Sequence, residues 1–450
     1  MANFYFIHNT RIVNEGEIFD GSISIENGII KKIIKGNISR ADIEYGYSII
    51  DGKGKFLIPG VIDDHVHFRE PGLTGKGDIY SESRAGIAGG VTSFMDMPNT
   101  VPQAITLEIL EEKFRAASEK SLANYSFYLG ASNDNLSEII KADKQHICGI
   151  KLFLGSSTGN MLVDNEYTLS RVFSETGMLI AAHCEDEQLI KFNLNKYTQE
   201  TGGELNISFH PLIRNIEACY RSSSLAVDLA LRYNARLHLL HMTTGKELSL
   251  LDNSPSSENK KITAEVCTHH LWFSENDYAL KGNLIKVNPA IKSENDRLAL
   301  FNALSGNMID VIASDHAPHL LEEKMDEYIN APSGAPMIQH SLTLMLEFYH
   351  RKMISLENIV EKMCHAPARI FNIRNRGFIR EGYQADIVII DPETGSTINR
   401  PSILYKCGWS TLEGVTMHSK VCMTFVNGNL VYDGHTFNEG STGQALIFNR

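Results

Sequence analysis

Short apolar runs alternate with longer helical stretches through the middle of the chain, and this alternation constrains the fold more than any other feature. A typical helical stretch is TLEILEEKFRAASEK, which separates two runs rich in β-forming residues. Parallel strands need a crossover between them, usually a helix, so the alternation is typical of βα units. Eight runs read as strands: GVIDDHVH, GGVTSFMDMP, YSFYLG, ICGIKLFLG, MLIAAHC, ARLHLLHM, KITAEVC and DVIASDHAP. The pattern predicts an α/β fold, a TIM-type (β/α)8 barrel with insertions.

The two ends of the chain have a different character. Near the N-terminus, GSISIENGIIKKIIKG alternates apolar and polar residues around an NG-type turn, and SKVCMTFVNGNLVYDG does the same near the C-terminus. Such patterns predict short strands joined by hairpins. We therefore expect a small β-sandwich domain built from both termini, residues 1–55 and 376–450, beside a barrel over residues 56–375.

Charge and cysteine content exclude several functional classes. The net charge of -12 argues against a nucleic-acid partner, which needs a basic surface. The N-terminus shows no signal peptide, and no run reaches the roughly 18 apolar residues of a membrane span. The seven cysteines are scattered and form no C-x-x-C pair. These features predict a reduced, cytoplasmic protein with no membrane association that acts on a small molecule.

Candidate metal ligands fall at the ends of several of the predicted strands. In such a barrel, the C-terminal strand ends meet at one mouth, where functional side chains gather. A period of two places both histidines of the first strand on one face. Each residue alone has a simpler explanation, such as a buried histidine bonded to a carbonyl or an aspartate capping a helix. Together, however, they predict a metal centre, whose ligands are His65, His67, His183, His241 and Asp315.

Lys151 lies in the fourth predicted strand, within CGIKLFLG. A strand lysine usually extends its ammonium group to water, but apolar neighbours flank this one on both sides. Burial would disfavour the charged form and leave a neutral amine. Such an amine beside two metal ions can react with carbon dioxide, and the resulting carbamate can bridge metals about 3.5–4 Å apart.

Taken together, the motifs resemble those of the dihydroorotases, a family within the cyclic amidohydrolase superfamily. The resemblance extends over essentially the whole chain, and its motifs occur in the family's order: PGVIDDHVHFREPG, MDMPNT, GIKLFLG, AAHCED, LHLLHMTT, KVNPAIKS and ASDHAPH. The loop after the eighth strand, SGAPMIQHSLTLML, departs from the PGLET of many relatives.

The resemblance implies a role for each of these residues. His65 and His67 would hold one zinc ion, and carboxylated Lys151 would bridge it to a second, which His183 and His241 would also hold. Asp315 would be both a metal ligand and the group that transfers a proton. The implied substrate contacts are Arg69, Asn99, Asn288, His319 and Gly334.

The resemblance also implies a reaction, the reversible interconversion of L-dihydroorotate and N-carbamoyl-L-aspartate in de novo pyrimidine synthesis. Allantoinases, hydantoinases and dihydropyrimidinases share the metal ligands, but their substrates lack the ring carboxylate that Arg69 and Asn99 would suit. A catalytically silent relative that serves as a partner of aspartate carbamoyltransferase is a further alternative. A homodimer or higher homo-oligomer is expected, with aspartate carbamoyltransferase as a candidate partner.

Overall fold

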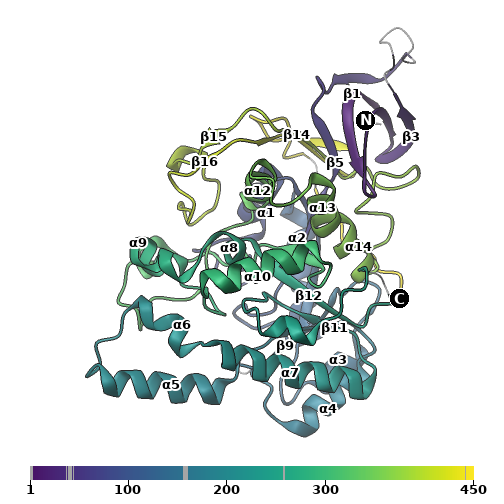
Figure 1. The fold of residues 1–450 in the computed structure, drawn as a ribbon. Coiled ribbons are helices and arrows are strands. Elements are labelled where there is room, and N and C mark those ends of the chain that lie inside the picture. The colour runs from purple at the N-terminus through teal and green to yellow at the C-terminus, as the bar shows by residue number, and fades with distance from the viewer. Residues whose placement is uncertain are drawn as a thin grey trace.

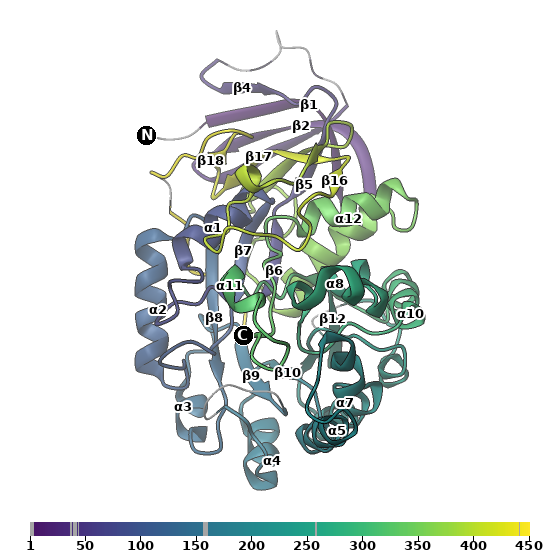
Figure 2. The same cartoon turned by 90° about the vertical axis from the view of Figure 1, so that its left-hand side faces the viewer.

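The computed structural model describes residues 4–36, 38, 43, 45–155, 161–256, 259–440 and 442–450, and Figures 1 and 2 show two views of it. Eight parallel strands form one sheet in chain order, as the sequence predicts. They are β6 (Val61–Val66), β7 (Val91–Asp96), β8 (Asn124–Gly130), β9 (Gly149–Phe153), β10 (Ile180–His183), β11 (Leu237–Leu239), β12 (Ile262–Cys267) and β13 (Val311–Ala313).

The first and last strands of this sheet come together at their C-terminal ends. A parallel bridge pairs Val66 with His316, and the His67 amide donates to the His316 carbonyl at 2.7 Å. The sheet therefore curves into a nearly closed barrel, which confirms the predicted fold. The same closure brings the ends of β6 and β13 side by side at the barrel mouth.

Helices cover the outside of the barrel (Figure 2). Those on the side of β7 to β10 are α1 (Ile79–Ala88), α2 (Leu107–Lys120), α3 (Leu136–Lys141) and α4 (Glu166–Glu175). The others in the first two thirds of the chain are α5 (Glu187–Glu200), α6 (His210–Ile213), α7 (Ile216–Tyr233), α8 (Thr268–Trp272) and α9 (Tyr278–Lys281). They are followed by α10 (Glu294–Ser305), α11 (Leu321–Lys324), α12 (Ser341–His350), α13 (Leu356–Val360) and α14 (Ala366–Ile370).

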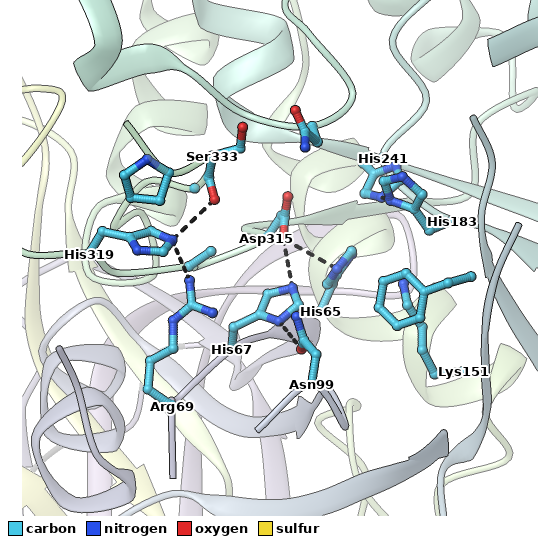
Figure 3. Close-up of a pocket in the computed structure, with 15 residues that line it drawn as sticks. His65, His67, Arg69, Asn99, Lys151, His183, His241, Asp315, His319 and Ser333 are labelled. Carbon is cyan, nitrogen blue, oxygen red and sulfur yellow. Dashed lines mark hydrogen bonds and ion pairs between the residues drawn. The ribbon is translucent and has the colours of Figure 1, made fainter. Parts of the chain in front are cut away.

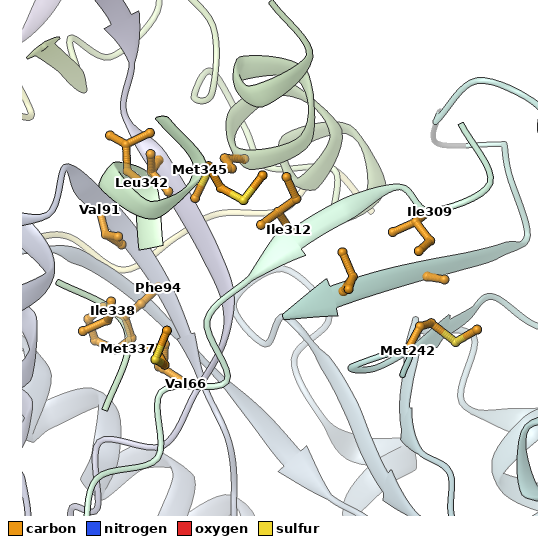
Figure 4. Close-up of a cluster of buried hydrophobic side chains, with 14 of the residues drawn as sticks. Val66, Val91, Phe94, Met242, Ile309, Ile312, Met337, Ile338, Leu342 and Met345 are labelled. Carbon is orange, nitrogen blue, oxygen red and sulfur yellow. The ribbon is translucent and has the colours of Figure 1, made fainter. Parts of the chain in front are cut away.

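The sequence of α2 explains why this segment is helical and how it packs. Thr106 caps the helix, because its hydroxyl accepts a hydrogen bond from the amide of Ile109. Leu110, Lys113 and Ala117 are buried at helical spacing and face the sheet. The buried Lys113 ammonium donates to Asp96 at 2.6 Å, at the end of β7. α12 also packs on the barrel through apolar side chains: Figure 4 shows Leu342 and Met345 among side chains from the barrel strands.

Strands from both termini form a second sheet, which sits above the barrel in Figures 1 and 2. Its order is β18 (Asn429–Tyr432), β17 (Lys420–Val426), β14 (Ile387–Asp391), β5 (Phe56–Pro59), β1 (Phe4–Asn14), β2 (Glu17–Glu26) and β3 (Ile29–Lys35). β4 (Ser48–Asp51) pairs with β1, and β15 (Ser396–Thr397) pairs separately with β16 (Thr416–Met417).

The expected boundaries after residue 55 and before residue 376 stay a prediction, and part of the expected segment 1–55 lies outside the described residues. β5, just past the first boundary, belongs to the terminal sheet. The last residues of the chain instead lie against the barrel, where the Leu446 amide donates to the Tyr125 carbonyl at 2.8 Å. No helix in the described ranges is both long and apolar enough to cross a membrane.

Candidate active site

One cavity at the C-terminal mouth of the barrel, of about 310 Å³, collects every site residue that the sequence predicts. Figure 3 shows His183, His241 and Lys151 on one side, Arg69 and His319 on the other, and Asp315, His65 and His67 between them. The eleven predicted residues that line the cavity are His65, His67, Arg69, Asn99, Lys151, His183, His241, Asn288, Asp315, His319 and Gly334. The site therefore has a histidine-rich part and a cationic part.

His65, His67 and Asp315 form the first group of candidate ligands. Asp315 Oδ1 lies 3.3 Å from His65 Nε2 and 3.1 Å from His67 Nε2. The ligand atoms of these three residues all lie within 4.8 Å of one another, and the residues are buried. Two imidazole nitrogens and a carboxylate oxygen are ligands that zinc accepts. The group has the composition and size of a metal site.

Hydrogen bonds on the far side of each ring determine which nitrogen faces Asp315. His65 Nδ1 lies 2.6 Å from Glu265 Oε1, and His67 Nδ1 lies 2.7 Å from Asn99 Oδ1. Both partners accept, so each Nδ1 carries a proton and donates it. Burial lowers the pKa of His67 to about 4 despite the nearby Asp315, so its Nε2 is unprotonated at neutral pH.

Consequently an imidazole lone pair of His67 faces a carboxylate oxygen of Asp315, and both are acceptors. For His65, burial opposes the charged form, but Glu265 and Asp315 outweigh it and raise the pKa. Asp315 therefore attracts a positive charge, a proton or a metal ion, to the space between these side chains. Outer partners that fix the ring orientation, as Glu265 and Asn99 do, are the usual environment of metal-binding histidines.

His183 and His241 form the second group. His183 Nδ1 lies 2.8 Å from His241 Nε2, and His183 Nε2 lies 3.0 Å from Glu185 Oε2. Burial is the main reason that the pKa of each histidine falls below its usual value. The two rings are therefore neutral near pH 7, and His183, which donates to Glu185, directs an Nδ1 lone pair at its neighbour. Neutral imidazole is the form that binds zinc.

Lys151 lies on the same side of the cavity as His183 and His241. It lies on β9 opposite Ala181 of β10, and its Nζ sits 4.5 Å from the centroid of the Phe153 ring. Burial, only partly offset by Glu265 and Asp315, lowers the pKa of Lys151 to about 8. A fraction of this amine is uncharged near neutral pH, and it can therefore act as a nucleophile.

Three residues of the site adopt the left-handed backbone conformation that residues other than glycine rarely take. The φ angles are 68° at Arg69, 40° at His241 and 45° at Asp315. Such conformations cost of order 1–3 kcal/mol each and cluster at functional sites. Here they turn the chain at the ends of β6, β11 and β13, directly where the side chains enter the cavity.

The cationic part of the cavity is built around Arg69, which is only 7% exposed. Its Nε donates to the Pro318 carbonyl at 3.0 Å, and its Nη2 lies 3.0 Å from His319 Nε2. Throughout the described ranges, no carboxylate forms an ion pair with this guanidinium. Burial lowers the pKa of Arg69 to about 10, but the group is still charged at neutral pH.

Asn288 and Gly334 also line the cavity. Asn288 Oδ1 is buried and has no hydrogen-bond partner among the residues that the structure describes. Gly334 has a φ of 138°, and a Cβ there would lie 2.7 Å from the Ala317 carbonyl oxygen and 3.0 Å from His319 Cδ2. Only glycine fits this position without displacing the wall.

Sequence reasoning missed the carboxylates that orient the histidines. Glu265 is fully buried in β12, contacts His65 and accepts a hydrogen bond from the His241 amide at 2.9 Å. The available signal was a single acidic residue within the apolar run ITAEVC. Glu185 follows His183 by two residues, and it also pairs with Arg214.

The helix-capping alternative for Asp315 is wrong, because the next helix, α11, begins at Leu321.

Comparisons with known proteins show what the chain is similar to. Residues 56–431 match the profile of the amidohydrolase family. The dihydroorotase of Methanosarcina acetivorans is 32% identical over 422 residues, which cover 91% of this chain and 88% of the relative. That of Pyrococcus abyssi is 33% identical over 426 residues, 94% of each protein. Among solved structures, the L-hydantoinase (dihydropyrimidinase) of Arthrobacter aurescens superimposes with a TM-score of 0.89 at 25% identity, covering 100% of this chain and 98% of that one.

Proposed function

The chain belongs to the amidohydrolase family, and we propose that it is a zinc-dependent dihydroorotase. The family and the curated relatives indicate a cyclic amide hydrolase. The proposed reaction opens L-dihydroorotate to N-carbamoyl-L-aspartate and, in reverse, closes the ring for pyrimidine synthesis.

The observation that carries the choice of substrate is the environment of Arg69. A buried guanidinium that lacks a carboxylate partner in the described chain is costly unless a ligand supplies one. Arg69 lines the same cavity as the candidate metal ligands, so that ligand would be the substrate. A planar guanidinium matches a carboxylate in two parallel hydrogen bonds. Dihydroorotate carries a ring carboxylate, whereas hydantoin and dihydrouracil do not.

The donor set fits two zinc ions. His65, His67 and Asp315 would hold one, and His183 and His241 the other, because each group presents imidazole nitrogens within contact distance of a further ligand. We propose that Lys151 is carboxylated and bridges the two, which its uncharged fraction near neutral pH supports. Zinc bound there would supply Lewis-acid chemistry and a nucleophile at neutral pH.

Asp315 is the proposed proton-transfer group. The neighbouring His65 and His67 outweigh its burial and hold the pKa of this carboxyl well below its usual range, so it is ionised and able to accept a proton. In the hydrolytic direction it would take the proton from the attacking water and deliver it to the leaving ring nitrogen. Arg69 and His319 would hold the substrate at the opposite wall, and Asn288 Oδ1, buried without a partner in the described chain, would accept from a ring N–H.

Two alternatives stay open to experiment. The likeness to the Arthrobacter aurescens L-hydantoinase supports a hydantoinase-type amidase, for which Arg69 would have no role. A silent partner of aspartate carbamoyltransferase would have no need for an intact ligand set, yet all six proposed ligands line one cavity here. Homo-oligomeric assembly, association with aspartate carbamoyltransferase and a cytoplasmic location also stay predictions.

A direct test is to assay the purified protein with L-dihydroorotate, allantoin, hydantoin and dihydrouracil side by side, and to measure bound metal on the same sample. We expect about two zinc ions per chain, as the two ligand groups predict, and a strong preference for dihydroorotate. A preference for hydantoin or dihydrouracil would instead indicate a hydantoinase-type amidase. Bound metal without turnover of any ring would favour the silent relative.

A further inference from the structure

Lys76, which the sequence analysis did not identify, contacts His319 in the cationic part of the cavity from outside. Its ammonium nitrogen lies 3.1 Å from His319 Nδ1 and 2.7 Å from Glu323 Oε1. The lysine comes from the turn after β6, and Glu323 comes from α11. The Lys76 side chain is 20% exposed, so it is partly screened from water. Lys76 is not among the residues that line the cavity.

Among the described residues, three polar groups lie within hydrogen-bond distance of the His319 ring, and one protonation state cannot satisfy all three. Nδ1 faces Lys76, while Nε2 lies 3.0 Å from Arg69 Nη2 and 3.1 Å from the Ser333 carbonyl oxygen. Lysine and arginine only donate, and a carbonyl only accepts. The doubly protonated ring is disfavoured, because burial first, and then Arg69, Lys76 and Lys324, lower the pKa of His319.

Of the two neutral forms, the one with its proton on Nε2 satisfies more contacts. In it, Nδ1 accepts from Lys76 and the Nε2 proton is donated to Ser333, and only the approach of Arg69 is unfavourable. In the other form, the Nδ1 proton opposes the ammonium and the Nε2 lone pair opposes the Ser333 carbonyl. Glu323 Oε2 lies 3.7 Å from His319 Nδ1, which is too far for a hydrogen bond that would reverse this preference.

We propose that Lys76 is a positioning residue that fixes the tautomer of His319, so that His319 and Arg69 both direct N–H donors at the substrate carboxylate. Two donors whose nitrogen atoms lie 3.0 Å apart repel each other unless an acceptor lies between or beside them. A carboxylate oxygen that contacts both would supply that acceptor and would replace Ser333 as the partner of Nε2. Figure 3 shows Arg69, His319 and Ser333 together at one wall of the cavity.

This inference rests on the proposed function for the identity of the anion, but the tautomer itself can be measured without substrate. The side chains can be labelled with ¹⁵N-histidine, and the His319 signals identified among the 17 histidines by their loss in His319→Gln. Protonated and unprotonated ring nitrogens have well-separated ¹⁵N shifts. We expect the proton on Nε2 in the native protein and in Lys76→Arg, and a mixture of the two forms in Lys76→Met.

Kinetics then separate positioning from a general structural role. Lys76→Met should raise KM for dihydroorotate about tenfold, the effect of one weakened hydrogen bond to a charged group, while kcat changes little. KM for dihydrouracil should stay within about twofold, since that ring has no carboxylate to engage the donors. Lys76→Arg should restore most of the loss. Lys55→Met is a matched control, because Lys55 is similarly exposed at 24% and also has one carboxylate partner, Asp391, but it directly precedes β5 of the terminal sheet.

A native protein with the His319 proton on Nδ1, or a Lys76→Met variant with unchanged tautomer and unchanged KM, would overturn the inference. Equal losses with both rings would likewise assign Lys76 a structural role only. A protein that never turns over dihydroorotate would refute the proposed function instead, and the resting tautomer would still decide the role of Lys76.

Discussion

Replacing Arg69 with methionine should separate substrate choice from metal binding. Methionine preserves much of the apolar stem of arginine but removes every donor. In the structure Arg69 Nε is already bonded to the Pro318 carbonyl, at 3.0 Å, so the terminal nitrogens are the ones that remain for a ligand. Arg69 is not a member of either group of candidate metal ligands, although it follows His67 by only two residues.

The size of the effect follows from the number of bonds lost. A carboxylate held by the guanidinium fork accepts two charge-assisted hydrogen bonds, each of which contributes about 1.5–3 kcal/mol. Their sum of about 3–6 kcal/mol corresponds to a fall of about 10²–10⁴ in kcat/KM for dihydroorotate. The loss of the bond to Pro318 lowers the free energy of unfolding by about 1 kcal/mol. Because this loss does not involve the substrate, it should affect turnover of all substrates equally.

The assay compares kcat/KM for dihydroorotate and dihydrouracil in wild type, Arg69→Met and Arg69→Lys, with bound zinc measured on each. We expect turnover of dihydrouracil to change less than about threefold, because it makes neither of the two bonds. Arg69→Lys keeps the charge without the fork and should fall between the other two. Equal losses on both rings, or loss of zinc in the variants, would refute the assignment of Arg69 to the carboxylate.

The barrel and the members of the site could be predicted because one physical rule connects them. Parallel strands joined by helices end at the same mouth, so His183 and Asp315 must meet if both end strands of one barrel. Their separation in the sequence does not matter to that argument. The period of two on β6 likewise places His65 beside His67 without knowledge of any contact.

The partners that orient those residues could not be predicted by the same rule. His65 and Glu265 are 200 positions apart, and Lys76 and His319 are 243 apart. Whether a buried carboxylate meets a particular ring nitrogen depends on rotamers and on turns of a few residues, for which the sequence offers no periodic signal. The left-handed backbone at His241 is of the same kind: histidine takes a positive φ more often than most residues, but no turn-forming residue beside it signals that conformation. The end of the chain, which lies on the barrel at Tyr125, also carries no pattern that specifies its position.

Three further predictions concern the proposed carbamate at Lys151, proton transfer by Asp315 and the stability of the folded protein. Lys151→Ala should lower metal content and activity together, and short carboxylic acids should restore part of both; two retained zinc ions with normal turnover would contradict the proposed carbamate. Asp315→Asn keeps the size of the side chain but cannot accept the proton, so kcat should fall about 10²–10⁴-fold, and an unchanged kcat would move the role to another group. Asp78 caps α1, accepting from the Ser81 amide at 2.7 Å and from Lys406 at 2.6 Å. Asp78→Ala should therefore lower the free energy of unfolding by about 0.5–2 kcal/mol in urea titrations near pH 7. Burial alone would raise the pKa of Asp78, but the bonds from Lys406 and Ser81 lower it in the folded protein. The stabilisation is then present above the unfolded pKa of about 3.9 and is lost as the pH falls through the folded value. The difference between wild type and Asp78→Ala should shrink as the pH drops below about 4, and a difference that stays constant with pH would show that the charge of Asp78 adds nothing to the cap.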